Sequence, residues 1–266
     1  MRPMEILKID NVSISYGGQR PVVKKVNLSV KPKEIIGIVG ESGSGKSTLI
    51  RAVLGLLPIG GRVSVGEITF KGRNLLEYSK KEWRELRGNK IAMIFQNAGA
   101  SLSPTRKIGN QFIESIQAHF NSSKADAYAK AIDMLAKMRL PDAIGIMNSY
   151  TFQLSGGMKQ RVAIAMAMTM EPELLLADEP TSALDVTIQA QVVREMMELR
   201  NQFNTSIIIV THNMGVASYM SDKIGVMRQG ELVEWGSRAQ VINNPQDEYT
   251  ANLISAIPEL GGCRLV

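Results

Sequence analysis

The sequence contains a single cysteine, Cys263, among its 266 residues, which excludes an internal disulfide and a cysteine-rich metal site. This cysteine content is typical of a protein in a reducing cytosol. Long apolar runs are also missing. The longest ones, 35–39, 174–177 and 207–210, have the length of buried strands, whereas a membrane-spanning helix needs roughly 18 to 20 residues. The first residues alternate charged and apolar types, so we expect no signal peptide and expect any membrane contact to depend on a partner.

Charge and aromatic content narrow the classes of partner. The formal net charge of +6 favours acidic partners, such as a nucleotide, a nucleic acid or an anionic lipid surface. Aromatic residues make up only 5% of the chain, and few of them lie near the densest basic cluster to stack on bases. That cluster consists of Lys80, Lys81, Arg84, Arg87 and Lys90. The hydrophobic content of 44%, without repeats or low-complexity segments, is typical of a folded globular chain.

The order of the apolar segments predicts an α/β fold. Alternating apolar residues between 4 and 34 predict antiparallel strands, and the fully apolar segment 35–39 predicts a strand buried on both faces. Short strands are also expected at 66–72 and 91–95. Strands and helices alternate later in the chain, as in a parallel sheet. The strands are expected at 174–177, 207–210 and 223–227, and the helices at 188–202 and 214–220.

These segments predict one main domain and a short extension. We expect the main domain to cover residues 1–236, with a helical subdomain inserted at about 97–172, where apolar residues follow helical spacing from 108 onward. The extension, 237–266, is polar and is expected to contain one helix at 249–257.

A glycine-rich segment follows the strand at 35–39 and precedes a helix expected at 47–57. Glycines let successive backbone N–H groups converge on phosphate oxygens, and a helix that begins near Lys46 directs its positive end at the same anion. Lys46 adds a cation at the β- and γ-phosphates, and Ser47 adds a hydroxyl for Mg²⁺. A dinucleotide-binding fold is a weaker alternative, because glycines stand about 20 residues on, where that fold needs an acidic ribose ligand. The segment matches the pattern G-x4-G-K-[ST] with Gly40, Glu41, Ser42, Gly43, Ser44, Gly45, Lys46 and Ser47, followed by Thr48.

Two carboxylates, Asp178 and Glu179, follow the strand expected at 174–177. Ligands of open parallel sheets lie at this end of the strands. We assign Asp178 to Mg²⁺ and Glu179 to the general base that activates the attacking water. Gln96 ends another strand, and its amide is placed to reach the metal or the water. The alternative interpretations are an acidic turn and an ordinary surface glutamine.

His212 comes directly after the strand at 207–210 and is expected at the same sheet edge, where an imidazole can hold the γ-phosphate. A structural histidine is the alternative. A second anion site is expected before the helical stretch 159–170, since Ser155 is a typical N-cap residue and the glycines after it expose backbone N–H groups. The other interpretation is an ordinary capped helix without a ligand. Against it, the chain has two segments suited to phosphate, far apart in the sequence, whereas one nucleotide needs only one. This segment consists of Ser155, Gly156, Gly157 and Met158.

In type and order these motifs resemble those of the ATP-binding subunits of ABC transporters. The motifs, in order, are Tyr16, 40–47, Gln96, 154–158, 178–179, 182–185 and His212, and the resemblance covers about residues 4–235. It implies a P-loop NTPase (RecA-like) core with a parallel sheet, an N-terminal antiparallel β subdomain and an inserted α-helical subdomain. It also implies a head-to-tail dimer that hydrolyses ATP. The residues that would contact the ATP held by the partner are Ser155, Gly156, Gly157, Met158 and Asp185. Tyr16 would stack on adenine.

Within that family, residues 96–111 and 244–258 resemble the peptide and nickel importer branch. The resemblance implies a subunit at the cytoplasmic face of the cell membrane that powers import of a peptide, nickel or a metal chelate. The permease would be a separate integral membrane protein docking near 97–111, with a solute-binding protein as an indirect partner. Some members hold an iron–sulfur cluster in a cysteine-rich tail, and with Cys263 alone we expect none. Met158 departs from the glutamine more common in the wider family.

Two other functions are weighed against an importer ATPase. A soluble ABC-type ATPase acting on nucleic acid or ribosomes is mildly favoured by the positive charge, but the chain has neither two fused halves nor a long coiled-coil insertion. We therefore expect no direct nucleic acid partner. A nucleotide-binding regulator without turnover is disfavoured by Glu179. The transported solute stays open, as does whether the second ATPase subunit is the same chain or a paralogue.

Overall fold

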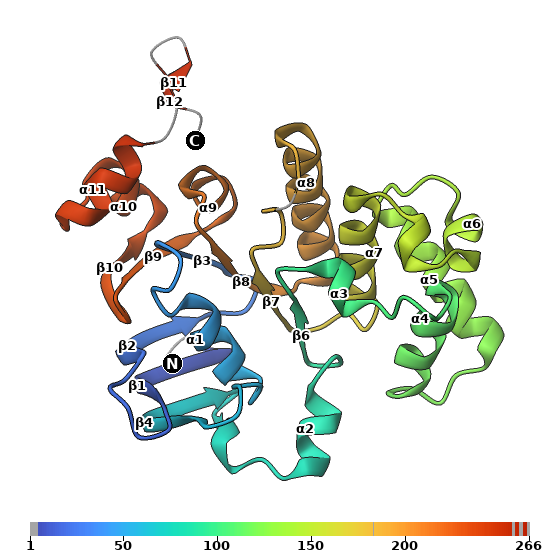
Figure 1. Ribbon diagram of the computed structural model, residues 1–266, viewed down its shortest axis with the longest axis horizontal. Helices are drawn as coiled ribbons and strands as arrows, with labels where there is room; N and C mark the ends of the chain where they lie inside the picture. Colours follow the sequence, from blue (N-terminus) through green and yellow to red (C-terminus); the bar gives the residue numbers. More distant parts are fainter. Residues whose placement is uncertain (1–4, 183, 257–258, 261–262, 265–266) are drawn as a thin grey trace. The chain divides into compact units, whose positions relative to one another are not determined.

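The computed structural model describes residues 5–182, 184–256, 259–260 and 263–264 (Figure 1). The chain divides into two units. The first combines the described residues up to Lys80 with those from Ser206 onward, and the second covers Lys81–Thr205. Each unit contains its own strands and helices, and the segments that carry the sequence motifs are shared out between them.

An antiparallel sheet in the first unit has the strand order β2-β1-β4-β5, and it confirms the antiparallel strands expected near the start of the chain. The strand expected at 66–72 instead begins earlier, at Gly61. Gly66 does not bound this strand but lies inside it at a φ of 86°, next to a register shift against β1. A Cβ there would come within 2.4 Å of the carbonyl oxygens of Asp10 and Asn11. Gly66 is thus a bulge residue inside the strand, whereas from the sequence it was expected to be the first residue of the strand. The strands are β1 (Leu7–Tyr16), β2 (Val23–Val30), β4 (Gly61–Phe70) and β5 (Arg73–Asn74), and η1 (Leu75–Glu77) follows them.

The second set of strands in this unit contains the buried strand β3 (Ile35–Val39) between two parallel neighbours, β8 (Ser206–Thr211) and β9 (Lys223–Arg228). The antiparallel strand β10 (Glu231–Ser237), not expected from the sequence, pairs with β9. Helix α9 (Met214–Met220) lies as expected and contacts β3 and β8.

Helix α1 (Lys46–Val53) begins where the sequence predicts but ends four residues before the expected 57. Gly55 follows it at a φ of 60°, and the N–H groups of Gly55 and Leu56 bond to the last carbonyls of the helix. This left-handed glycine closure stops the helix.

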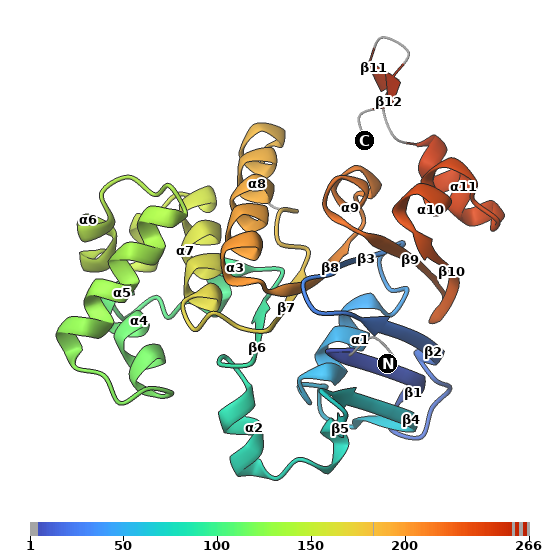
Figure 2. The same cartoon turned by 180° about the vertical axis from the view of Figure 1, so that it is seen from behind.

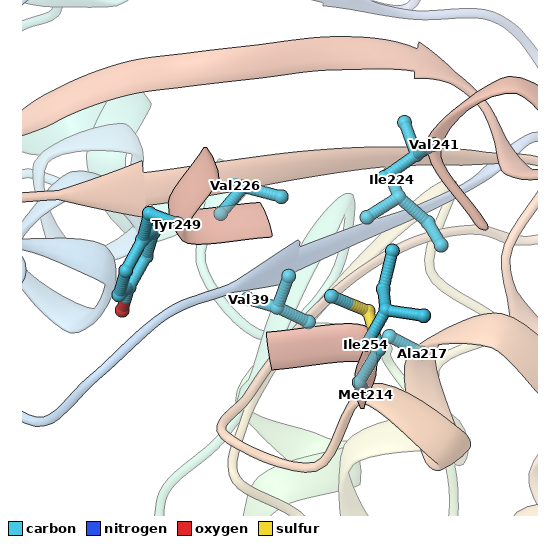
Figure 3. Close-up of a cluster of buried hydrophobic side chains, with 8 residues drawn as sticks. All are labelled: Val39, Met214, Ala217, Ile224, Val226, Val241, Tyr249 and Ile254. Atoms are coloured by element: carbon cyan, nitrogen blue, oxygen red, sulfur yellow. The ribbon is translucent and has the colours of Figure 1, made fainter. Parts of the chain in front are cut away.

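The C-terminal segment corrects the expectation of a polar tail with one helix. It forms two helices, α10 (Arg238–Asn243) and α11 (Glu248–Ser255), and the short strands β11 (Glu259–Leu260) and β12 (Cys263–Arg264). The start of α10 is a capping box, in which Ser237 and Gln240 satisfy each other's backbone N–H groups. Both helices contribute side chains to a hydrophobic cluster, shown in Figure 3. Ile257, the expected end of the last helix, lies outside the described residues.

The second unit pairs β6 and β7 in parallel and adds helices around them. The expected helical character of 108–172 is confirmed by α4 to α7. Figure 2 shows α4, α5 and α6 side by side, and each of these contacts the other two. Helices α2 and α3 were not expected. The elements are α2 (Lys80–Leu86), β6 (Ile91–Ile94), α3 (Ala98–Ser101), α4 (Ile108–Gln117), α5 (Lys124–Lys137), α6 (Ala143–Asn148), η2 (Thr151–Gln153), α7 (Gly156–Met168), β7 (Leu174–Asp178) and α8 (Val186–Phe203).

The α/β class predicted from the sequence is confirmed by this architecture. The domain boundaries at 97–172 and 236 stay predictions, and the second unit is wider than the expected helical insertion because β6, β7 and α8 belong to it. Over the described ranges, none of the helices combines the length and the apolar character needed to cross a membrane.

Candidate functional site: a phosphate cradle and a glutamate at a strand end

The glycine-rich segment forms the turn between β3 and α1 in the first unit. Gly40, Gly43 and Gly45 have φ values of 150°, 81° and 100°, which only glycine adopts readily. A Cβ on Gly40 would lie 2.1 Å from the carbonyl oxygen of Met227 in β9, so this position also lacks room for a side chain. The chain can therefore curl back tightly at the end of the buried strand.

Lys46 lies inside this turn, and its side chain folds back onto the loop. It is only 5% exposed, and its ammonium donates to the carbonyl oxygens of Gly40 and Glu41 at 2.7 and 2.6 Å and to Ser44 Oγ at 3.3 Å. A buried cation needs such acceptors, because burial without them costs several kcal/mol. The loop thus holds a positive charge at its centre.

Helix α1 starts directly at Lys46, after Gly45. Gly45 has no side chain to cap the first N–H groups of the helix, and these groups together with the helix dipole favour an anion. Ser47 and Thr48 lie half-buried in this first turn. The uncapped start of α1 therefore lies in the segment that the sequence singled out for an anion, and phosphate binding there stays a prediction.

His212 lies at the same sheet edge as the loop. The parallel register pairs Val39 with Thr211, so Gly40 and His212 each follow the last paired residue of neighbouring strands. The imidazole is exposed. Tyr16 ends β1 in the antiparallel sheet, paired with Gly61, and its ring is half-buried. A Cβ on Gly61 would lie 2.6 Å from the Tyr16 ring, so the glycine makes room for it.

Gln96 and Glu179 meet in the second unit. The register of β6 against β7 pairs Ile94 with Ala177, so both residues lie two positions beyond that pair. Gln96 Nε2 donates to Glu179 Oε2 at 3.3 Å. Glu179 has a φ of 47°, a strained backbone conformation for a non-glycine residue and one that clusters at functional sites. The sequence-predicted pair is thus brought together, with the carboxylate held by a neutral donor.

Asp178 is the last residue of β7, and its side chain is fully buried. The described residues contain no group of three or more histidine, cysteine and acidic side chains suited to hold a metal. Mg²⁺ bound with a nucleotide needs only one or two carboxylates, since phosphate oxygens and waters supply the other ligands. The residues assigned to Mg²⁺ are oxygen donors of this kind, but Ser47 belongs to the first unit and Gln96 and Asp178 to the second, so their shared binding of the ion stays a prediction.

The segment before α7 carries the second predicted anion site. Ser155 caps the helix as predicted, with Oγ accepting from Met158 N at 3.3 Å, and Ser155 and Gly156 are exposed. A Cβ on Gly156 would meet nothing within 4 Å, whereas one on Gly157 would lie 3.2 Å from Ile188 of α8. The first two residues of this segment are therefore an open surface.

Asp185 is the N-cap of α8, with Oδ1 accepting from Ile188 N at 3.0 Å. Its side chain is exposed at the end of the turn that follows Glu179. Ala183, two positions earlier in the sequence, lies outside the described residues.

One contact of the phosphate loop was missed by the sequence analysis. The hydroxyl of Tyr249, in α11, accepts a hydrogen bond from the backbone N–H of Glu41 at 2.9 Å. Burial raises the pKa of this phenol above its ordinary value. The sequence singled out the segment around Tyr249 only by resemblance, because no local pattern connects two positions 208 residues apart.

Known proteins are similar to this chain in sequence. The profile of the ABC transporter family matches residues 23–182. The chain is 42% identical to the dipeptide transport ATP-binding protein DppD of Lactococcus lactis subsp. cremoris, over 97% of this chain and 75% of the relative. It is 41% identical to the oligopeptide transport ATP-binding protein OppD of Salmonella typhimurium, over 96% of this chain and 77% of the relative.

Solved structures agree with these sequence matches. A dimer of the ATP-binding cassette MJ0796 in a post-hydrolysis state with ADP and phosphate has a TM-score of 0.77 and 27% identity, covering 87% of this chain and 98% of that one. The structure of CbiO1 from Clostridium perfringens, part of an ABC transporter complex, has the same TM-score and identity, over 91% and 92% of the two chains. The chain therefore belongs to the ABC transporter family, as one of its ATP-hydrolysing subunits.

Proposed function

We propose that this chain hydrolyses ATP to power the import of a peptide through a separate membrane permease. The observation that carries the proposal is the similarity along almost the whole chain, at 41–43% identity, to several ATP-binding proteins named for peptide, dipeptide or oligopeptide transport. Nickel and metal chelates, which the sequence left open, stay predictions. The position at the cytoplasmic face of the membrane is part of the same proposal, with the permease as the anchor.

The phosphate loop is proposed to bind the triphosphate of ATP. Backbone N–H groups from Gly43 to Thr48 would surround the β-phosphate, and the ammonium of Lys46 would exchange its present carbonyl partners for phosphate oxygens. This exchange is favourable because a charged donor binds a charged acceptor more strongly than a neutral carbonyl. Tyr16 is proposed to stack on the adenine ring. The preceding loop residues, Gly40, Glu41 and Ser42, would hold these N–H groups in position around the phosphate.

Glu179 is proposed as the general base. Its carboxylate would take a proton from the water that attacks the γ-phosphorus, and Gln96, already bonded to it, would orient that water. His212 would donate a hydrogen bond to the γ-phosphate. Mg²⁺, when bound through Ser47, Gln96 and Asp178, supplies positive charge that offsets the charge of the phosphate oxygens.

The exposed Ser155–Gly156 segment is proposed to act on the ATP bound by a second ATPase subunit in a head-to-tail dimer. Ser155, Gly157, Met158 and Asp185 would contact that nucleotide in trans. The open surface at Gly156 supports this assignment, since an anion can approach the first turn of the helix there, beside the Ser155 hydroxyl that caps Met158 N.

The permease is proposed to dock on the segment 97–111. This segment is structured by Gln111, whose side chain bonds to both backbone groups of Ser103 at 2.8 and 3.1 Å. Thr151 Oγ1 also donates to the Ser103 carbonyl at 3.1 Å, which ties η2 to it. Phe152 of η2 is 69% exposed and stacks on Tyr150 at 5.5 Å between ring centroids. An exposed phenylalanine stacked on a half-buried tyrosine, beside a small, weakly polar loop, suits a short amphipathic helix of a partner.

Uptake measurements test the proposed function. Cells or vesicles that contain the permease and the solute-binding protein are expected to import a labelled dipeptide with the wild-type chain and to lose import with Glu179→Gln. Nickel uptake in a parallel arm tests the other solute class. Dipeptide uptake that continues with Glu179→Gln contradicts the proposal, as does ATP turnover that responds to RNA or ribosomes but not to peptide.

A further inference from the structure

The C-terminal helix α11 contacts the phosphate loop through one polar atom. Tyr249 Oη accepts the N–H of Glu41, the residue after the glycine that opens the loop, at 2.9 Å. Figure 3 shows the Tyr249 ring at one edge of the hydrophobic cluster, with its hydroxyl oxygen pointing away from the other labelled side chains. The ring therefore belongs to the core, whereas its hydroxyl serves the loop.

The position of this hydroxyl is fixed by packing. Tyr249 is 8% exposed in a cluster with Val39, the residue directly before the loop, and with Val226 of β9. The guanidinium of Arg228 lies over the ring, 5.0 Å from its centroid. At the start of α11, Asp247 Oδ1 accepts the N–H of Tyr249 at 2.8 Å. A ring held on several sides presents its hydroxyl at one place and loses little entropy in doing so.

Glu41 is held on its carbonyl side as well. Its oxygen accepts from Lys46 Nζ at 2.6 Å and from Ser44 N at 3.2 Å. With the N–H bonded to Tyr249, both backbone polar groups of Glu41 have partners. Loop residues ordinarily rely on water for such partners and are more mobile. The same residue on which Lys46 rests is thus fixed from the C-terminal helix.

We propose that Tyr249 is a positioning residue for the phosphate loop, through which the C-terminal helix prepares the loop for ATP. The proposal rests on the proposed function in that the loop binds ATP. Tyr249 does not touch the nucleotide in this scheme. It holds the entrance of the loop in the curled form, so that ATP binding does not have to order that part of the chain.

The decisive variant is Tyr249→Phe. The phenyl ring keeps the packing against Val39 and Val226 and the contact with Arg228, and only the hydrogen bond to Glu41 is lost. We expect the Kd for Mg-ATP, measured by calorimetry on the full chain, to rise roughly 3- to 10-fold, the loss expected for one hydrogen bond. Amide exchange at Glu41, followed by NMR without nucleotide, is expected to become faster, while amides in β3 and β8 keep their protection.

Tyr219→Phe is the matched control, because Tyr219 lies on α9 in the same unit and is 53% exposed. This variant also removes one phenol hydroxyl, and it is expected to leave both the Kd for Mg-ATP and the exchange rate of the Glu41 amide unchanged. Equal behaviour of the two variants would overturn the proposal, and so would faster exchange throughout β3, since that result indicates general loosening. If the wild-type chain itself does not bind ATP, the proposed function fails, whereas the exchange at Glu41 still tests Tyr249 separately.

Discussion

Lys46 shows at the scale of one residue how the loop is prepared for an anion. Its ammonium rests on carbonyl oxygens of the loop, and the charged oxygens of a phosphate are stronger acceptors for it. Lys46→Ala is therefore expected to weaken ATP binding by about 100-fold, measured as the Kd for Mg-ATP. Lys31→Ala, an exposed charge in the same unit, is the control and should leave the affinity within about twofold. Unchanged affinity of the Lys46 variant would contradict the phosphate-loop assignment.

Glu179→Gln separates binding from turnover. The amide has nearly the shape of the carboxylate and can still accept the hydrogen bond from Gln96, but it cannot take a proton from water. We expect ATP to bind with ordinary affinity and hydrolysis to fall by about 10² to 10⁴, measured as phosphate release with the partner subunits present. Glu198→Gln, on an exposed face of the same unit, should hydrolyse at the wild-type rate. Rapid phosphate release from the Glu179 variant would exclude its role as base.

Tyr249 is expected to make the free energy of unfolding depend on pH in the alkaline range. Burial raises the pKa of its phenol in the folded chain above the value of the unfolded chain, about 10. The folded state then keeps its proton when the unfolded state has lost it, so this contribution to stability is complete below pH 10 and is lost as pH rises through the folded pKa. The free energy of unfolding, measured between pH 8 and 11, should fall more steeply for the wild type than for Tyr249→Phe. Parallel curves would contradict the buried phenol.

At the scale of elements, local signals predicted the strands and helices that carry the motifs. The apolar run of β3, the glycines after it and the start of α1 are encoded within about a dozen residues, as are Ser155 and α7. Elements that form because of contacts between distant segments were not predicted. Strand β10 has half-buried residues between two exposed ends, without alternation, and in the short helix α10 only Val241 is buried. The bond between Tyr249 and Glu41 belongs to this second class.

The segment 97–111 is the element proposed to meet the permease. Ser101→Cys and Ser103→Cys, each in a Cys263→Ser background, place one thiol there for a photo-crosslinker. We expect crosslinks to a cytoplasmic loop of the permease, with a yield that changes when ATP is added, since Gln96 lies next to this segment and bonds to Glu179. Arg194→Cys, exposed on α8, is the control position. If both serine positions stay freely labelled in the assembled complex while Arg194→Cys crosslinks, the docking site lies elsewhere.

For the whole molecule, the motifs of one chain are divided between two units. The phosphate loop, Tyr16 and His212 lie in the first, and the second carries Gln96, Glu179 and the Ser155 segment. If the phosphate loop and the Ser155 segment both bind anions, as proposed, the second surface has no use unless another ATPase subunit supplies the ATP. The relative MJ0796 has been solved as a dimer, which agrees with this reasoning.

The head-to-tail dimer is tested by blocking hydrolysis. Glu179→Gln with saturating Mg-ATP should accumulate a dimer, alone or with a paralogous ATPase subunit, because the ATP that joins the two halves is not split. Light scattering after gel filtration measures the mass.

Adding Lys46→Ala to this variant should return it to a monomer by removing ATP. Adding Ser155→Arg should do so while each chain still binds ATP, because in the proposed dimer the exposed Ser155 faces the nucleotide of the partner and a bulky side chain blocks that approach. A Ser155 variant that dimerises fully would show that this surface does not face the second ATP, and a Glu179 variant that stays monomeric with every candidate subunit would contradict the sandwich itself.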